Sequence, residues 1–376
     1  MSEQLGLAAT SAADGAQSPK TSLQPDEHFA INAEVEREEA MRAFWMIEML
    51  DSIFALGVSS QVSIPAVPRN TRLPCGDKLW ESEEFFQQEP SHQNLQYSSG
   101  FSMCISLCTT ELGTVNRFQQ TVRDSNEIAG GLEWQSAAQR LDERLTIWRE
   151  EFVAAVFRLI NTEFPGDSHA EMEPFIVLTN CLLNMGLISL LQSQSSMPEG
   201  VGPGSDPVSQ HHSPEKSISH DIQWPYADHR CQYACENMAA KVRRMKEDEL
   251  KNCSPCLILP MFIAARFYIG TYPPPLLHAI LELIVSTWAV HTKCLRADVS
   301  VNLHSLAFGL HICSERWELA KLFELVIRTA VAEHRTPIIE SALPREFYDL
   351  QFSVLDLSPL LQNWADKISS AIPCHV

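Results

Sequence analysis

The sequence predicts an all-α protein with many helices, one long proline-rich loop and one disordered insertion. Three observations lead to this fold class. Apolar residues recur every three or four positions along several long segments, which is the period of a helix that buries one face. No run of useful length alternates apolar and polar residues as a strand does, and no fixed-period repeat is present. Hydrophobic residues make up 45% of the 376 residues, which is enough for a sizeable core.

The first long helix is expected at about 33–56. Asn32 can cap its N-terminus, and glutamates occupy its first turns, where the helix dipole is positive. Its second half is apolar nearly all round, which is typical of a buried helix, and Gly57 is a stop signal. Residues 58–98 then form a long irregular loop, and such a loop in a compact domain is more often specific than accidental. The prolines of this loop are Pro65, Pro68, Pro74 and Pro90.

The strongest helical pattern covers residues 132–160. Its apolar residues stand three or four positions apart and form one stripe, made of Trp134, Ala138, Leu141, Leu145, Trp148, Phe152, Val156 and Leu159. The remaining helices are expected at about 101–119, 174–191, 227–251, 255–270, 276–295, 299–313 and 315–333.

These patterns divide the chain into five parts. Residues 1–30 form a polar N-terminal segment, and residues 31–191 form the first part of the helical domain. Residues 192–222 are rich in Ser, Pro and Gly and lack periodicity, so they are expected to be a disordered insertion. Residues 223–336 form the second part of the helical domain, and residues 337–376 form a C-terminal tail.

The charge balance of 28 basic against 47 acidic residues gives a net charge of −19. Sequence-independent DNA binding requires basic side chains that neutralise phosphates, so the whole chain is not expected to bind DNA directly. No signal-peptide pattern is visible, and the longest apolar run, 257–269, is too short to cross a bilayer, so no membrane partner is expected. The 11 cysteines are expected to be reduced thiols in a nuclear or cytosolic compartment.

The sequence predicts no catalytic, cofactor-binding or metal-binding residues, and it indicates that the protein is not an enzyme. The HExxH, phosphate-loop and GxSxG motifs are all missing. Cys253 and Cys256 form a CxxC that supplies only two of the four ligands of a structural zinc site. Cys231 and Cys235 lie one helical turn apart, and we expect both to be small, buried core residues.

Three charged segments have two interpretations each. The acidic pairs at 142–143 and 150–151 are expected to be solvated, on the polar side of their helix, and not to bind a magnesium diphosphate. A basic cluster is either a nuclear-localisation or phosphate-binding element or an exposed helix face with paired charges; it consists of Lys241, Arg243, Arg244 and Lys246. The acidic and apolar tail at 349–366 is either an activation segment or a last helix docked on the core.

Five residues of the first helix, with two later dipeptides, resemble the signature of the fungal-specific transcription factor domain. They are Arg42, Phe44, Trp45, Leu50 and Asp51, followed by Ile64-Pro65 and Leu73-Pro74. Further stretches are similar to the family in the same order, namely Gln4–Leu7, Trp134–Trp148, Cys253–Tyr268 with Ala264-Ala265-Arg266, and Arg316-Trp317 with Ala320. The resemblance covers most of residues 4–335. It implies an all-helical regulatory region of fungal zinc-cluster transcription factors.

The signature also has a physical interpretation. Trp45, Met49 and Ser52 follow one stripe of the helix, and Phe44, Ile47 and Ile53 cover another side. Arg42 and Asp51 flank this apolar centre, and each needs a partner if it is buried, because an unpaired buried charge is very costly. The proline-rich loop is then expected to lie across the helices as a fixed cover.

The sequence departs from the family at several positions. Ser52 stands where the family usually has arginine, Ser59, Ser60 and Gln61 replace its Gly-Arg-Pro, and the six-cysteine DNA-binding zinc cluster is absent. The resemblance therefore implies a nuclear transcription regulator that acts through other transcription proteins or DNA-bound factors, including homo- or heterodimers. By analogy its targets are metabolic genes, such as a secondary-metabolite gene cluster. The alternatives are a helical interaction or ligand-binding module without a transcriptional role, and an unrecognised all-α enzyme.

Overall fold

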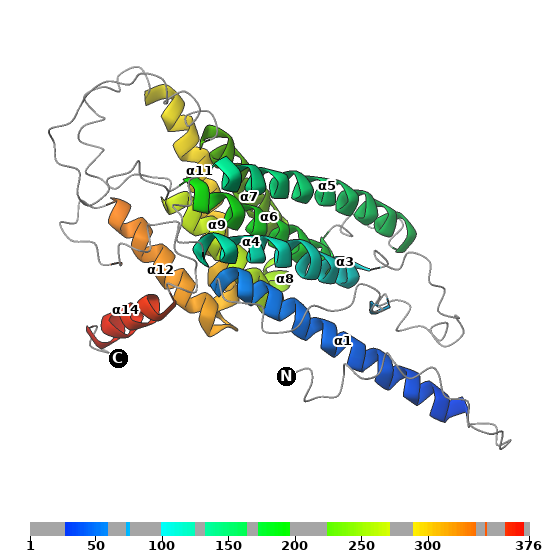
Figure 1. The fold of residues 1–376 in the computed structure, drawn as a ribbon. Coiled ribbons are helices and arrows are strands. Elements are labelled where there is room, and N and C mark those ends of the chain that lie inside the picture. The colour runs from blue at the N-terminus through cyan, green and yellow to red at the C-terminus, as the bar shows by residue number, and fades with distance from the viewer. Residues whose placement is uncertain are drawn as a thin grey trace. The chain divides into compact units, whose positions relative to one another are not determined.

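The computed structural model describes residues 27–58, 73–75, 99–124, 132–163, 172–195, 224–270, 289–335, 343 and 358–371. All elements within these ranges are helices, and none of these residues forms a strand, so the predicted all-α class is confirmed. The elements, of which Figure 1 labels the α-helices, are α1 (Glu27–Val58), α3 (Gly100–Ser106), the π-helix η5 (Leu107–Leu112), α4 (Gly113–Asp124), α5 (Leu132–Glu163), α6 (Pro174–Ser195), α7 (Trp224–Arg244), α8 (Glu247–Lys251), the 3-10 helix η7 (Pro255–Leu257), α9 (Ile258–Gly270), α11 (Ala289–Ser314), α12 (Glu318–Arg335) and α14 (Ser358–Ala371).

Two predicted helices differ from the observed ones in continuity. The segment expected as one helix at 227–251 is divided, because Lys246 has an extended backbone (φ −74°, ψ 158°) and starts the separate helix α8. The carboxylate of Glu249 accepts a 2.8 Å hydrogen bond from the Lys246 N–H and so caps this second start. Conversely, α11 continues without a break through residues 289–314, where the sequence suggested two helices that meet at 295–299.

The chain forms two compact units. Unit 1 contains residues 1–56, 60–117 and 147–179, and unit 2 contains residues 57–59, 118–146 and 180–376. Helices α4, α5 and α6 contribute residues to both units. The proposed disordered insertion at 192–222 lies outside the described residues, apart from the last turn of α6.

In unit 1, α1 packs against α3. Met49 of α1 is fully buried, and its Sδ lies 3.3 Å from the Sγ of Cys104. Every residue of α3 is buried. The ring of Phe101, at the start of α3, lies 4.8 Å from the ring of Phe175, in the first turn of α6. These contacts form an apolar core around α3.

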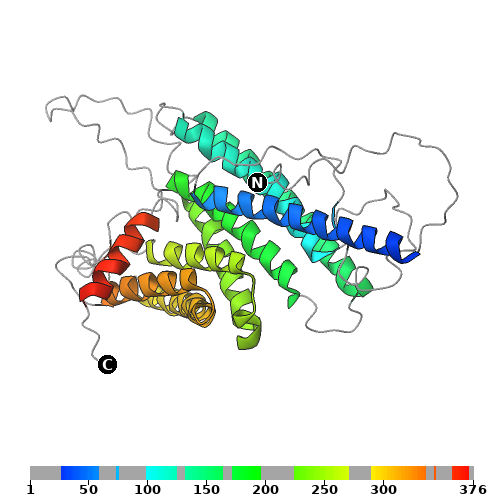
Figure 2. The ribbon, with the colours of Figure 1, turned by 90° about the horizontal axis from the view of Figure 1, so that it is seen from below.

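The core of unit 2 is built around α9, whose residues 258–269 are all buried. This helix contacts α7, α11 and α12. The rings of Phe262 and Phe323 stack with their centroids 3.9 Å apart and thereby join α9 to α12. Helix α14 packs on α12 through buried Leu361 and Trp364, and Figure 2 shows these two helices beside α11. For residues 358–371 the tail is therefore a docked helix.

One described helix, α6, is long and apolar enough by length and composition to cross a membrane. The window is Pro174–Leu191, and 78% of it is buried inside the fold. A core helix of a globular protein passes the same test, and the burial favours that interpretation here.

Gly309 marks the closest approach of α11 to its neighbours. A Cβ at this position would lie 2.9 Å from Cγ1 of Val242 and 3.0 Å from Sδ of Met261. Real Cβ atoms essentially never approach so closely, so α11 can pack on α7 and α9 at this depth only with glycine at this point.

We expect Gly309→Ala to destabilise the fold by about 1–3 kcal/mol, because overpacking forces neighbouring helices apart. The measurement is the free energy of unfolding in urea. Gly113→Ala is the matched control, because a Cβ there would meet nothing nearer than the Cys108 carbonyl oxygen at 3.7 Å. Equal stability of the two variants would contradict the proposed close packing.

Candidate functional site

The buried face of α1 contains two acidic residues. Trp45, Met49 and Ser52 are buried, as expected for their stripe. On the other predicted side Ile53 is buried, whereas Phe44 and Ile47 are half-buried. Glu38 and Glu48 are also buried, with exposed fractions of 1% and 5%. Buried carboxyl groups are costly unless they are paired or protonated, so these two positions need a specific explanation.

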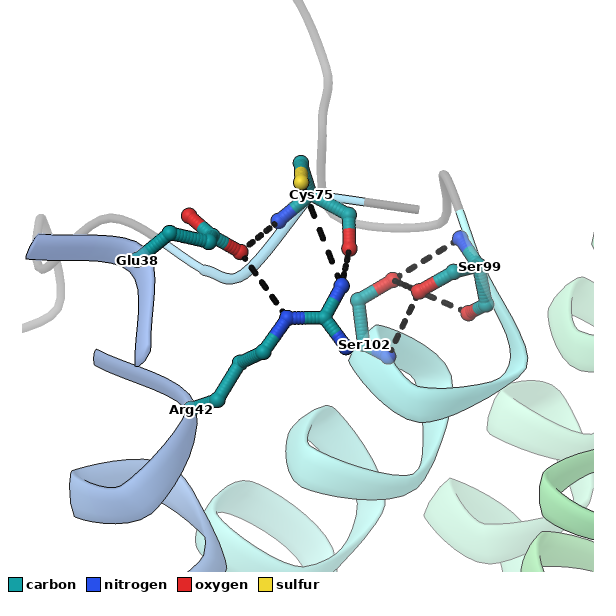
Figure 3. A network of polar contacts seen from close by, with 5 residues as sticks. All are labelled: Glu38, Arg42, Cys75, Ser99 and Ser102. Carbon is teal, nitrogen blue, oxygen red and sulfur yellow. Dashed lines mark hydrogen bonds and ion pairs between the residues drawn. The ribbon is translucent and has the colours of Figure 1, made fainter. Parts of the chain in front are cut away.

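Glu38 belongs to a network that joins α1 to the segment Leu73–Cys75 (Figure 3). Arg42 Nε lies 3.3 Å from Glu38 Oε1, and Arg42 Nη2 donates a 2.9 Å hydrogen bond to the carbonyl oxygen of Cys75. The N–H of Cys75 donates a 2.8 Å hydrogen bond to the same Glu38 oxygen. One ion pair thus binds both backbone groups of Cys75, and Glu38, Arg42 and Cys75 are called the Arg42 network below.

The Arg42 network explains two parts of the signature together. Arg42 was expected to need a partner, and it has both a carboxylate and a carbonyl. Leu73-Pro74 precedes the residue that this pair holds, so this middle part of the proline-rich loop is fixed against α1 as expected. The rest of the loop, including Ile64-Pro65, lies outside the described residues.

The remaining signature residues are only partly buried. Phe44 packs edge-on against Trp45 with ring centroids 5.3 Å apart, and both Leu50 and Asp51 are half-buried. The expectation that this half of α1 is buried all round is wrong at Phe54, whose side chain is 50% exposed. The helix therefore has one solvent-facing side.

Two helix starts of unit 1, those of α3 and α6, are capped by side chains. Ser99 and Ser102 form a reciprocal capping box at α3, in which Ser102 N donates to Ser99 Oγ at 3.1 Å and Ser99 N donates to Ser102 Oγ at 3.0 Å (Figure 3). The Glu173 carboxylate accepts hydrogen bonds from the N–H groups of Phe175 and Ile176 at the start of α6. These caps fix the start of α3, which α1 contacts, and the start of α6, whose Phe175 packs against α3.

The role of the Arg42 network is structural. Burial, followed by the nearby Glu38 carboxylate, raises the pKa of the Cys75 thiol to about 11, so the thiol stays protonated and is a poor nucleophile near neutral pH. Among the described residues, no three His, Cys, Asp or Glu side chains are grouped so that they could hold a metal ion.

Glu48 is the unusual group of α1. Burial raises its pKa to about 7, and the neighbouring Asp51 charge adds to the effect. Its buried Oε1 has no hydrogen-bond partner among the described residues. No sequence signal distinguishes Glu48 from the other glutamates of α1, because periodicity does not report what lies opposite a side chain.

In unit 2 the structure corrects the prediction for Asp142. This residue was expected on a solvated face, but it is buried, and its Oδ1 accepts a 2.6 Å hydrogen bond from Arg230 Nη2. The same Arg230 nitrogen donates to Thr146 Oγ1 at 2.8 Å. The expectation is confirmed for Glu143, Glu150 and Glu151, which are exposed.

The basic cluster occupies the C-terminal end of α7 and the turn after it. Arg243 and Arg244 are exposed, and Lys241 is half-buried. Arg243 donates a hydrogen bond to Asn302 Oδ1 of α11, and Asn302 in turn donates to the Tyr268 hydroxyl at 3.2 Å. Cations at a helix C-terminus also complement its dipole. Both observations favour the interpretation of a structural, solvent-facing cluster.

Cys231 and Cys235 are buried thiols in α7, as expected. Cys253 and Cys256 are also buried, but the Cys253 sulfur faces Cys313 of α11, 3.6 Å away. The residues around the later family stretches pack as a core: Ala264, Ala265 and Ala320 are fully buried. The Arg316 guanidinium lies 5.0 Å from the ring centroid of Trp317.

Replacing Arg42 by methionine removes the partner of the buried Glu38 carboxylate and releases Cys75. We expect Arg42→Met to lower the free energy of unfolding by about 2–3 kcal/mol, because a buried charged acceptor then loses its donors. The measurement is urea unfolding, with Arg158→Met as the control. Arg158 is exposed and bonds only a carbonyl of its own helix, so a similar loss there would refute the role of the Arg42 network.

Glu48 makes stability depend on pH in a defined direction. Its pKa in the folded protein, about 7, exceeds the ordinary value of 4.5, so the folded state binds more protons than the unfolded state between these values. Stability therefore falls as pH rises through this window and levels off above it. Glu48→Gln removes the effect and is expected to be more stable than wild type by about 1–3 kcal/mol on the alkaline side.

The measurement for Glu48 is the difference in unfolding free energy between Glu48→Gln and wild type across this pH range. Glu143→Gln, at an exposed position of α5, provides the control. A difference that stays constant with pH would show that Glu48 does not titrate as described.

Comparison with known proteins finds one domain and one relative to which the chain is similar. The model of the fungal specific transcription factor domain matches residues 1–150. The chain is 46% identical over 372 residues to the notoamide biosynthesis cluster transcriptional coactivator of Aspergillus versicolor, a match that covers 99% of this chain and 56% of that relative. The chain thus spans about half the length of the relative, and no solved structure matches it. Residues 1–150, which contain the Arg42 network, are thus similar to the fungal specific transcription factor domain.

Proposed function

We propose that this chain regulates the transcription of a secondary-metabolite gene cluster and acts in the nucleus as a coactivator. The observation that carries the proposal is the 46% identity to a biosynthesis-cluster transcriptional coactivator, which extends over 99% of this chain. Identity of this degree along the whole chain supports a shared mode of action, together with the domain match at residues 1–150.

The chain acts through other transcription proteins or DNA-bound factors. Its net charge of −19 opposes association with the phosphate backbone, so a partner supplies the DNA contact. The local basic cluster is already used within unit 2, where Arg243 bonds Asn302. Its position at the end of α7 therefore has an explanation that does not involve phosphate.

The proposed role is regulatory and not catalytic. Each unit contains buried polar side chains that pair within that unit, such as Glu38 with Arg42 in unit 1 and Asp142 with Arg230 in unit 2. The described thiols with raised pKa values, such as Cys75 and Cys181, are protonated near neutral pH. These features stabilise a helical scaffold, which is what a protein-binding regulator requires.

A fusion of the full chain to a heterologous DNA-binding domain tests this function directly. We expect the fusion to raise the output of a reporter gene that carries the matching DNA sites, because tethering replaces the DNA-bound partner. The DNA-binding domain alone is the control. Deleting the gene in its host is expected to lower the transcripts of a biosynthetic gene cluster, and the intact gene restores them.

The opposite results are equally clear. A fusion that is expressed and folded but leaves the reporter at the control level would contradict a coactivator role. Unchanged cluster transcripts after deletion would contradict control of secondary metabolism. Both together would favour a helical interaction module without a transcriptional role.

A further inference from the structure

Cys253 and Cys313 form a pair of neighbouring thiols that no sequence motif predicts. The two residues stand 60 positions apart, yet their sulfur atoms lie 3.6 Å from each other. The described cysteines are all free thiols. The more obvious partner of Cys253 in the sequence is Cys256, in the same CxxC, but the Cys253 sulfur contacts Cys313 instead.

Each cysteine lies in a turn at the end of a helix of unit 2. Cys253 follows α8, and its N–H donates a 3.3 Å hydrogen bond to the carbonyl oxygen of Leu250. Cys313 lies in the last turn of α11, and its thiol reaches the same Leu250 carbonyl at 3.5 Å. The backbone of Cys253 and the thiol of Cys313 thus share the Leu250 carbonyl oxygen as an acceptor, which holds the two residues near each other.

The two turns are also joined around the sulfur pair. Lys251 lies 3.3 Å from the carboxylate of Glu315, and Arg316 Nη1 lies 3.5 Å from Asn252 Oδ1. The carbonyl oxygen of Cys313 accepts hydrogen bonds from the N–H groups of Arg316 and Trp317. These contacts hold the turn after α8 next to the end of α11. The sulfur atoms can therefore move slightly closer together without a rearrangement of the helices.

The two thiols differ in acidity. A hydrogen bond from the Cys313 thiol lowers the pKa of Cys253, and the Arg316 charge adds to this effect against the opposing influence of burial. The same hydrogen bond and burial raise the pKa of Cys313. Cys253 is therefore the nucleophile of the pair, and Cys313 is the proton donor.

Access also differs between the two sulfur-bearing residues. Cys253 is 8% exposed and lies between the exposed residues Asn252 and Pro255, whereas Cys313 is fully buried. Cys253 is therefore the less shielded residue of the pair, and a small oxidant meets it before Cys313.

We propose that Cys253 and Cys313 form a redox-modification site, at which a hydroperoxide converts the two thiols into a disulfide that links the turn after α8 to the end of α11. This role goes beyond transcriptional regulation and does not depend on it. The geometry of the two turns carries the proposal, because it places the paired sulfur atoms next to each other in the reduced protein.

The chemistry balances in two steps. The Cys253 thiolate attacks one peroxide oxygen, so that an S–O bond forms, the O–O bond breaks and hydroxide leaves; sulfur is oxidised to a sulfenic acid and the peroxide is reduced. Cys313 sulfur then attacks the Cys253 sulfur, an S–S bond forms and the S–O bond breaks, and the leaving hydroxide takes the Cys313 proton to become water. In total, two thiols and one hydrogen peroxide give one disulfide and two waters.

Peptide mapping of the full chain tests the proposal. The purified, reduced chain is treated with hydrogen peroxide, its remaining thiols are alkylated with N-ethylmaleimide, and the digest is analysed by mass spectrometry. We expect a linked peptide that contains Cys253 and Cys313, which disappears after reduction with dithiothreitol. Recovery of both residues as alkylated thiols, or a Cys253–Cys256 link instead, would overturn the assignment.

Variants separate the roles of the two residues. Cys256→Ser is the matched control and keeps the Cys253–Cys313 link. Cys313→Ser removes the second step, so dimedone is expected to trap a sulfenic acid at Cys253; no trapping would overturn the order of steps. The wild-type map decides the existence of the disulfide by itself, even if Cys313→Ser does not fold.

Discussion

The first unit depends on one buried carboxylate. Glu38 on α1 is shielded from water, and it is stable there only because Arg42 and the Cys75 N–H surround one of its oxygens. The geometry of these donors is directional, so it fixes both the rotation of α1 and the position of the chain at Cys75. An apolar residue at position 38 could be buried equally well, but it could not hold the backbone of another segment by both of that segment's polar groups.

The same principle operates in unit 2 with different partners. Asp142 of α5 is held by Arg230 of α7, and Asn184 of α6 donates to Asn237 of α7 at 3.1 Å. Such pairs add orientation to a core that hydrophobic burial alone would leave less specific. These buried polar contacts help to keep the helices of each unit in one arrangement.

The sequence predicts helices well where one element determines its own pattern. Most of the α5 stripe from Ala138 to Leu159 is buried as expected, with Leu141 and Val156 half-buried, because periodicity records which face avoids water. Prediction from the sequence fails where a residue far away in the chain determines the environment of a side chain. Asp142 looks solvated until Arg230, 88 positions away, covers it, and Cys253 looks like half of a CxxC until α11 brings Cys313 to it. The break before α8 was missed because the charged residues 241–251 all favour helix locally, and only the extended backbone at Lys246 separates the two helices.

The apolar helix α6 affects the folding and the abundance of the protein in the cell. Its 18-residue apolar window is mostly hidden in the folded state, and any unfolded or newly made copy presents that stretch to its surroundings. Exposed segments of this kind recruit chaperones and promote aggregation. The abundance of the protein should thus be set by how quickly this helix is enclosed after synthesis, and modest losses of stability would reduce the amount of regulator through degradation before they altered any contact it makes.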